Sequence, residues 1–144
     1  MDWFVKAFLR SSVVWLATGV TLGIAMGMWP AWSIYRTAHL HMLLLGFVGM
    51  MIFGVAYHVL PRFTGVQLPS GRAAIGHLWL ANAGLAAMVV GFVLRARGIP
   101  VSSTWLAAGG SAAAAGAYIF GYLVWRMLGS RPKPMAGPRT LPVK

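Results

Sequence analysis

Four long apolar stretches constrain this chain more than any other feature. They cover residues 12–29, 39–60, 73–94 and 102–125, and a helix needs about 20 apolar residues to cross roughly 30 Å of hydrocarbon. The chain as a whole is 59% hydrophobic and only 9% charged, which lies outside the range of soluble domains. We therefore expect an all-α membrane protein with four transmembrane helices.

Short connections separate these stretches and carry residues that interrupt helices. Pro30 follows the first stretch, Pro61 the second and Gly98 the third. Short connections make neighbouring helices antiparallel, so we expect an up-down bundle that forms one domain over residues 1–129. The basic, proline-rich segment 130–144 is expected to be a disordered tail, either free or in loose contact with anionic lipid.

The basic residues predict the orientation of this bundle in the membrane. The net charge is +11, but the charges fall at the ends of the apolar stretches, so we expect contact with a lipid bilayer and none with nucleic acid. A cytoplasmic N-terminus leaves only Arg36, Arg95 and Arg97 outside. Because cytoplasmic loops are enriched in Lys and Arg, both termini are expected in the cytoplasm, which suits a multi-pass protein of a prokaryotic inner membrane. The residues then expected inside are Lys6, Arg10, Arg62, Arg72, Arg126, Arg131, Lys133, Arg139 and Lys144.

Several classes of chemistry are excluded by the composition. The chain has no cysteine, so it has no disulfide, no covalently attached haem and no iron–sulfur cluster. Its only acidic side chain is Asp2, so the apolar stretches offer no carboxylate for proton relay or for a hard cation. The four histidines are therefore the main candidates for a functional site.

Two of these histidines, His39 and His41, lie at the start of the second stretch. A step of two residues turns an α-helix by about 200°, so the side chains point to opposite faces and cannot chelate one ion. One helix could present a ligand to each of two cofactors, or one ligand to a cofactor and the other to a neighbouring helix. The alternative is that both histidines make structural hydrogen bonds between helices.

The setting of the pair suits a flat macrocycle. In an α-helix, Gly46 lies nearly in line with His39, and Met50 lies about one turn further on the same side. We expect the glycine to clear a surface for the ring and the methionine to line it. Arg36, one turn before His39, could pair with haem propionates, although an arginine at this position could equally serve topology alone.

The other two histidines, His58 and His77, are secondary candidates for a metal or a second haem. Both are expected at the cytoplasmic ends of adjacent helices, where they could meet across the loop 61–72. The alternative is that each bonds to free carbonyl groups at a helix end. In the fourth stretch, a run of alanine and glycine over residues 107–117 would let another helix approach closely, either from this chain or from a partner.

The second stretch resembles a helix of a known family. It opens with Ala38-His39-Leu40-His41, continues through Gly46, Gly49 and Gly54, and ends with Tyr57-His58-Val59-Leu60-Pro61-Arg62. This pattern is similar to a late helix in the catalytic subunit (subunit I) of C-type haem-copper oxidases and nitric oxide reductases. His77-Leu78-Trp79-Leu80 resembles the opening of that family's next helix. The resemblance covers roughly residues 31–95.

The resemblance implies specific roles for the two histidines. His39 matches the position that ligates the high-spin haem, and His41 matches the ligand of the low-spin haem. The family's catalytic subunit has about twelve helices, and the remaining ligands come from helices that this chain lacks. We therefore do not expect a complete oxidase or reductase site in this chain alone, and we do not expect copper.

These observations lead to one main hypothesis and two alternatives. The first is a membrane protein that binds haem b through His39 and His41, with one or two haems per chain or shared between protomers, for electron transfer or binding of a diatomic gas. A homodimer or another oligomer would supply further ligands, and a respiratory-chain protein is the expected partner. The alternatives are a haem-free accessory or assembly subunit of a respiratory oxidase, and a copper or haem delivery protein.

Overall fold

The computed structural model describes residues 1–130, and every regular element in this part of the chain is helical. Helix α1 spans Trp3–Met28, α4 spans Gly71–Ala96 and α5 spans Ser102–Leu128. Between α1 and α4, one continuous helical stretch of 35 residues covers Pro30–Thr64. All four are long and apolar enough to cross a membrane, which confirms the expected class of protein. The predicted tail lies, apart from Ser130, outside the described residues.

The second helical stretch changes its geometry along its length. It begins with a 3₁₀ helix, η1 (Pro30–Tyr35), and continues as α-helix in α2 (Arg36–His41). A π-helix, η2 (Met42–Gly49), follows directly after the histidine pair, and α3 (Met50–Thr64) completes the stretch. Such π segments are rare and frequently occur at functional sites, where they change the direction of the side chains that follow.

The ends of the helices differ from the expected boundaries. Helix α3 continues through Pro61 and ends where Gly65 adopts a left-handed conformation with φ of 66°, so Pro61 does not stop the helix as expected. Neighbouring helices and local adjustments can satisfy the carbonyl that a proline leaves free in a transmembrane helix. Helix α1 likewise begins nine residues before the expected stretch, because it includes Lys6 and Arg10.

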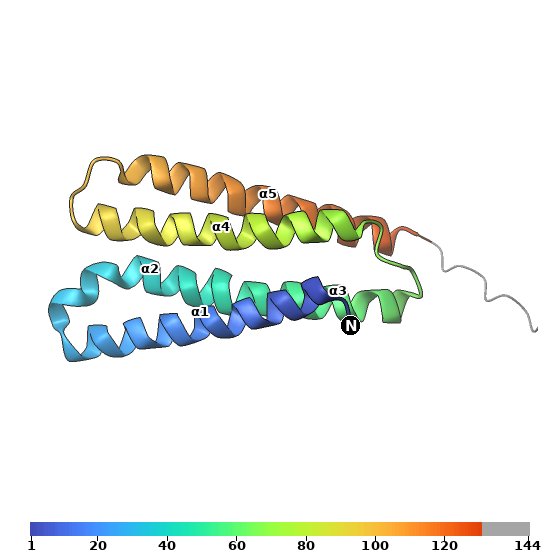
Figure 1. The fold of residues 1–144 in the computed structure, drawn as a ribbon, viewed down its shortest axis with the longest axis horizontal. Helices are drawn as coiled ribbons and strands as arrows, with labels where there is room; N and C mark the ends of the chain where they lie inside the picture. The colour runs from blue at the N-terminus through green and yellow to red at the C-terminus, as the bar shows by residue number, and fades with distance from the viewer. Residues whose placement is uncertain (131–144) are drawn as a thin grey trace, which may run out of the picture.

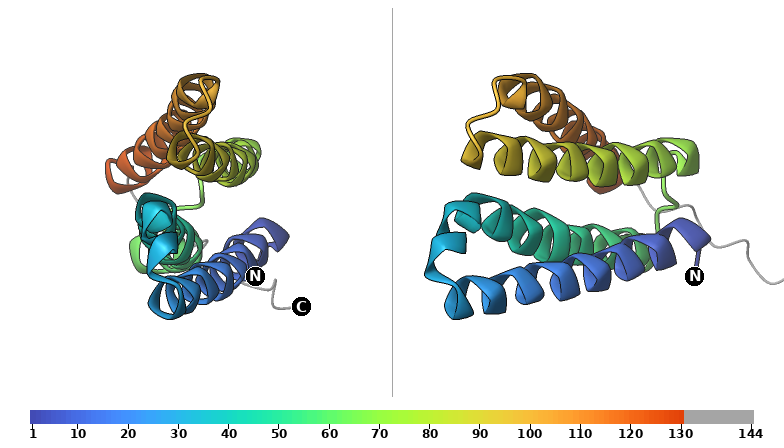
Figure 2. Two further views of the ribbon diagram at one scale, coloured as in Figure 1. Left: turned by 90° about the vertical axis from the view of Figure 1, so that its left-hand side faces the viewer. Right: turned by 60° about the vertical axis from the view of Figure 1, so that its left-hand side comes forward.

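The helices form two pairs that run along the same axis. Helix α1 lies beside the stretch from α2 to α3, and α4 lies beside α5, as Figure 1 and both views of Figure 2 show. The N-terminus and the end of α5 lie at one end of the molecule, together with the loop that joins α3 to α4. We call this the loop end, and the opposite end, with residues 29–36 and 97–101, the turn end.

Close contact between α4 and α5 depends on glycine. A Cβ atom at Gly84 would lie 2.6 Å from the backbone nitrogen of Ala113, and one at Gly109 would lie 2.6 Å from that of Met88. Both distances are shorter than real contacts of this kind, so the backbones meet because these side chains are missing. The run of small residues in the fourth stretch therefore packs against a helix of the same chain, α4.

A core of aromatic and aliphatic side chains joins the two pairs. It includes Phe8 of α1, Met50 and Tyr57 of α3, and Leu123 of α5. Nearer the centre of the molecule, Trp15 Nε1 donates a hydrogen bond of 3.2 Å to Asn82 Oδ1, which links α1 to α4. The two pairs are thus held together by apolar packing and by polar contacts between their helices.

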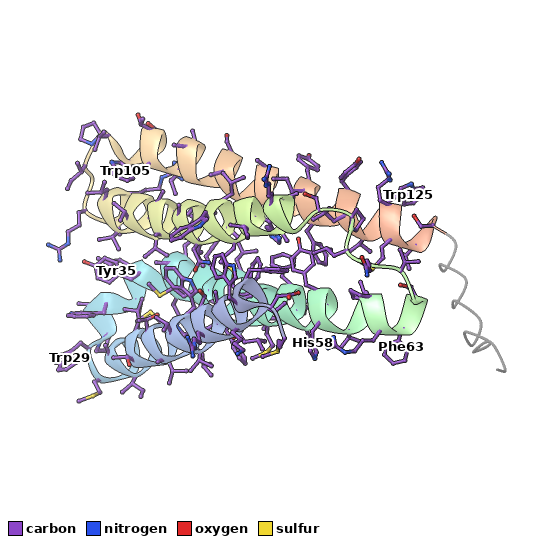
Figure 3. The ribbon with its side chains drawn as sticks, turned by 45° about the vertical axis from the view of Figure 1, so that its right-hand side comes forward. Trp29, Tyr35, His58, Phe63, Trp105 and Trp125 are labelled. Atoms are coloured by element: carbon purple, nitrogen blue, oxygen red, sulfur yellow. The ribbon has the colours of Figure 1, made fainter. Side chains whose placement is uncertain are left out.

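Most of the apolar surface faces outward. Within the most apolar window of each helical stretch, only between 11% and 33% of the residues are buried inside the chain. Aromatic residues mark both ends, with Trp29, Tyr35 and Trp105 near one end and Phe63 and Trp125 near the other in Figure 3. An exterior of this kind is consistent with contact with a lipid bilayer, because exposing so large an apolar area to water is unfavourable.

Candidate functional site

His39 projects from α2 onto helix α1. Its Nδ1 atom lies 2.8 Å from the carbonyl oxygen of Gly19, and the ring edge packs against Gly23, where a Cβ atom would lie 2.8 Å from His39 Cε1. A side chain at position 23 would therefore collide with the ring in its present place. The carbonyl of Gly19 and the space left by the missing side chain of Gly23 together orient this imidazole; we call them the glycine cradle.

His41 projects to another side of the same helix. Its Nδ1 atom lies 2.9 Å from the carbonyl oxygen of Thr37, one turn earlier. The ring centroid lies 4.6 Å from that of Phe92 in α4, at a tilt of 46°. His39 thus contacts α1 whereas His41 contacts α4, so the two rings do not converge on one metal ion.

Both contacts determine which ring nitrogen carries the proton. A carbonyl oxygen only accepts hydrogen bonds, so Nδ1 of His39 and Nδ1 of His41 are the donors. In a neutral imidazole the lone pair is then on Nε2, which can bind a metal. Histidine ligands in metalloproteins are commonly held in this way, with the second nitrogen donating to a carbonyl. Each ring therefore fits an axial ligand of haem iron.

The other two histidines are arranged differently. Nδ1 of His58 lies 3.0 Å from a guanidinium nitrogen of Arg62, which can only donate, so the proton of a neutral ring is on Nε2. His77 is fully buried, its Nδ1 lies 2.9 Å from the Tyr57 hydroxyl, and its Nε2 has no hydrogen-bond partner among residues 1–130. Because His58 faces Arg62 and His77 faces the core, they do not meet as the sequence suggested they could.

An aromatic cage encloses the ring of His77. Phe53 lies 4.5 Å from it, Phe8 5.0 Å and Phe120 5.7 Å, measured between ring centroids. The side chains of this cage come from α1, α3 and α5, and they leave no room for a flat macrocycle beside His77. Among the described residues, no group of three or more histidine, aspartate or glutamate side chains is placed to hold a metal ion.

Gly46 and Met50 do not clear a surface below His39. A Cβ atom at Gly46 would lie 2.5 Å from Cγ of Trp15 and 2.9 Å from Cδ2 of Leu85, so other side chains fill this space. Met50 is 1% exposed, and its sulfur lies 4.0 Å from the Asn82 amide nitrogen. The expectation assumed α-helical spacing, whereas the i→i+5 bonds of η2 place more residues in each turn and change the direction of both positions.

Arg36 is exposed at the turn end, where α2 begins. The only acidic residue, Asp2, precedes α1 at the other end of the molecule, so no acidic side chain of this chain competes for the guanidinium. Arg97 lies at the same end and donates a hydrogen bond of 2.8 Å to the hydroxyl of Tyr35. Arg36 therefore remains suited to a carboxylate of a ligand.

A macrocycle at either histidine would be only partly enclosed by this chain. Two pockets of about 510 and 490 Å³ lie at the loop end and the turn end, and neither His39 nor His41 lines them. Beside the histidines, the large side chains of Leu40 and Leu44 are 41% and 61% exposed. The Nδ1 contacts orient both imidazole rings, but the walls of a pocket for a macrocycle would need a second chain or lipid.

The residues around these sites that were not predicted from the sequence include Gly19, Gly23, Tyr57 and Asn82. The spacing of Gly19, Gly23 and Gly27 at intervals of four was a readable signal, because it places small residues on one face of a transmembrane helix. Asn82 was readable as the one polar amide in an apolar stretch. The Tyr57–His77 contact joins two helices and had no such signal.

Comparisons with known proteins add no relative to this description. A scan against models of protein families found no match, and a search of the curated proteins found no match either. The contacts of the histidines and the motifs of the sequence therefore carry the functional argument.

Proposed function

We propose that this chain is a b-type haem-binding membrane protein in which His39 and His41 are axial ligands. The observation that carries the proposal is the anchoring of both Nδ1 atoms on carbonyl oxygens, at 2.8 and 2.9 Å, which puts the lone pair of each neutral ring on Nε2, the atom that would bind iron. The sequence resemblance to subunit I of C-type haem-copper oxidases supports the same two residues. Haem held in this way supplies one-electron transfer or binding of a diatomic gas.

The remaining residues would orient and neutralise the haem. The carbonyl of Gly19 holds the ring of His39, and the absence of a side chain at Gly23 lets that ring lie close against α1. Arg36 is placed to neutralise a propionate at the turn end, because a guanidinium pairs well with carboxylates. The contact of Phe92 with His41 limits the rotation of that ring.

A second chain is part of the proposal. Each histidine supplies one ligand, and the side chains beside the pair are open to the surroundings. A homodimer, or another oligomer formed through helix packing, would cover this face and could supply the second axial ligand. Where no second ligand arrives, the sixth position remains available to nitric oxide, carbon monoxide or oxygen. A respiratory-chain protein is the proposed redox partner.

The proposed setting is the inner membrane of a prokaryote. The helices would form an up-down bundle with the loop end and both chain termini in the cytoplasm, because most of the basic residues belong to that side. The histidine pair would then lie near the outer face. No complete oxidase or reductase site is proposed for this chain alone.

One observation favours the alternative of a haem-free accessory subunit. The contact of His39 with Gly19 also links α1 to α2, so it can serve as a structural hydrogen bond without any cofactor. Helix α5 presents an outward face of small residues that would let a partner helix approach closely. This face comprises Ala107, Ala108, Ser111, Ala114 and Ala115, all of them exposed.

Alanine variants of the histidines test the proposal. His39→Ala and His41→Ala should each sharply lower the haem that copurifies with the protein, measured as the ratio of Soret to protein absorbance. His58→Ala is the matched control, because it removes an imidazole from the same helical stretch at the other end. Equal haem retention in all three variants would refute the ligand assignment.

A further inference from the structure

A set of adjoining pockets follows the outer surface of α3 from the middle of the bundle to the loop end. The first, of about 320 Å³, has only apolar side chains in its wall, including Met51, Val55 and Val59. The second, of about 270 Å³, shares Val59 with the first and adds Arg62 and Phe63. The third, of about 510 Å³, shares Arg62 with the second and is partly polar. Because Val59 and Arg62 each line two of these neighbouring pockets, we call the three together the α3 groove.

The polar end of the α3 groove holds two hydrogen-bond donors side by side. Arg62 donates to Nδ1 of His58 at 3.0 Å and also to the His58 carbonyl. Because arginine has no acceptor, the proton of a neutral His58 ring is on Nε2. The remaining N–H groups of Arg62 therefore offer donors to an anion, while Nε2–H of His58 points away from the guanidinium.

An acidic side chain lies in the wall of the same pocket. Asp2, the only acidic residue of the chain, lines it together with His58 and Arg62. An ionised carboxylate only accepts hydrogen bonds, whereas the guanidinium only donates them. At the polar end of the α3 groove, Arg62 can therefore donate hydrogen bonds to an anion, and Asp2 can accept hydrogen bonds from N–H or O–H groups of the same ligand.

The dimensions of the α3 groove match one leaflet of a bilayer. Met51 lies near the middle of the helical stretch Pro30–Thr64, and Arg62 lies close to its end. The 11 helical steps from Met51 to Arg62 rise by about 16 Å, which is about half of a hydrocarbon core roughly 30 Å thick. An acyl chain that follows the apolar wall would therefore bring its phosphate to the level of Arg62.

We propose that the α3 groove is a binding site for one phospholipid whose headgroup carries hydrogen-bond donors. One acyl chain lies along Met51, Val55 and Val59, and the phosphate diester accepts hydrogen bonds from Arg62, whose guanidinium is held by His58. The carboxylate of Asp2 accepts from the hydroxyl groups of a glycerol headgroup or the ammonium group of an ethanolamine headgroup. Choline has neither kind of hydrogen, so the site discriminates against it. This inference does not depend on haem.

Native mass spectrometry of the full-length, detergent-solubilised protein tests the site. Phosphatidylglycerol, phosphatidylethanolamine and phosphatidylcholine with the same acyl chains are titrated separately. We expect one tightly held molecule of either of the first two lipids, and about tenfold weaker binding of phosphatidylcholine, because it forgoes a charge-assisted hydrogen bond to Asp2. Equal binding of all three lipids would identify exchangeable lipid and overturn the proposal.

Three variants locate the lipid. Arg62→Gln should weaken phosphatidylglycerol binding, whereas Arg95→Gln, which changes an exposed arginine at the turn end, should not. Asp2→Asn should reduce the preference over phosphatidylcholine while the protein remains folded, which keeps the test valid if Arg62→Gln is unstable. Val59→Trp should fill the apolar wall and weaken all three lipids. Unchanged binding in Asp2→Asn and Val59→Trp, or full competition by inorganic phosphate alone, would contradict the site.

Discussion

At the scale of single residues, the missing side chain of Gly23 decides where the ring of His39 lies. The imidazole occupies the space that a Cβ atom would need, and this position brings Nδ1 to the Gly19 carbonyl. Gly27, one turn further along α1, differs because a Cβ atom placed there would have nothing within 4 Å. Gly23 and Gly27 belong to the same four-residue spacing, but only Gly23 makes room for the ring of His39.

A pair of valine substitutions separates these two glycines. Gly23→Val should displace the ring of His39 and break its contact with Gly19, which we expect to weaken haem binding about tenfold, as the loss of an outer contact to a metal ligand commonly does. Gly27→Val should leave haem affinity unchanged. The measurement is a titration of the haem-depleted protein with haem, followed by absorbance. Equal affinities in both variants would contradict the proposed cradle.

Another residue-scale feature is the buried pair of Tyr57 and His77. Their hydrogen bond of 2.9 Å lies inside the aromatic cage, where both side chains are buried. Because Nε2 of His77 has no partner, the contact with Tyr57 is the one hydrogen bond of this ring among the described residues. Removing one member leaves the other unpaired in an apolar setting.

Tyr57→Phe is therefore expected to lower the free energy of unfolding by about 1–3 kcal/mol, the usual cost of an unsatisfied buried polar group. The double variant Tyr57→Phe/His77→Leu should recover part of this loss, because it removes both polar groups together. Unfolding in mixed micelles by titration with a denaturing detergent measures both values. A neutral effect of Tyr57→Phe would show that the hydrogen bond contributes little.

At the scale of helices and their connections, the number and class of the helical stretches could be predicted from the sequence, whereas the geometry of the second stretch could not. The lengths of the apolar stretches alone identify four spans, because the thickness of the hydrocarbon core sets how many apolar residues a transmembrane helix needs. The π-helix η2 has no comparable signal in the apolar pattern, and the side chains of Trp15 and Leu85 that pack on its Gly46 come from helices distant in the sequence. Ideal α-helical spacing therefore places Gly46 and Met50 on the wrong side of the helix.

The candidate site was predictable to a similar degree. The His-x-His spacing indicated two ligands on different faces, and the contacts with Gly19 and Phe92 place the rings against different helices. The tautomers of these histidines were not predictable, because each depends on the atom that faces Nδ1. The position of His77 in the core was likewise missed, since its cage is built from helices distant in the sequence.

The contact between α4 and α5 gives a prediction at this scale. Gly109→Ala would place a Cβ atom 2.6 Å from the backbone nitrogen of Met88 and 2.7 Å from the Gly84 carbonyl oxygen, so the helices must separate. We expect a loss of about 1–3 kcal/mol in the free energy of unfolding, as in other overpacked cores. Gly110→Ala is the control, because a Cβ atom there meets nothing within 4 Å. Equal stability of the two variants would contradict this packing.

At the scale of the whole molecule, the charge distribution and the outward apolar surface define how the chain would sit in a membrane. Arg62 and Arg72 flank the loop between α3 and α4, while Arg36 and Arg97 lie near the connections at the opposite end. The proposed orientation places the first pair in the cytoplasm and the histidine site near the outer face. In the proposed function, this orientation would determine from which side electrons or gas reach the haem.

Single cysteines test this orientation directly, since the chain has none of its own. Ser33→Cys lies in η1 at the turn end, and Gln67→Cys lies in the loop at the other end, and both positions are exposed. In intact cells stripped of any outer membrane, an impermeant maleimide should label Ser33→Cys. Gln67→Cys should react only after permeabilisation. The reverse pattern would invert the topology and move the histidine pair to the cytoplasmic side.

The binding of haem is the claim on which the proposed function depends, and an absorption spectrum tests it most directly. The detergent-purified protein would be measured oxidised and reduced with dithionite, and a pyridine haemochrome would then count haem b per chain. We expect a Soret band and a haem b haemochrome, with sharp α and β bands on reduction if a second axial ligand is present. The absence of a Soret band, even after haem is supplied, would contradict this claim and favour the haem-free accessory subunit.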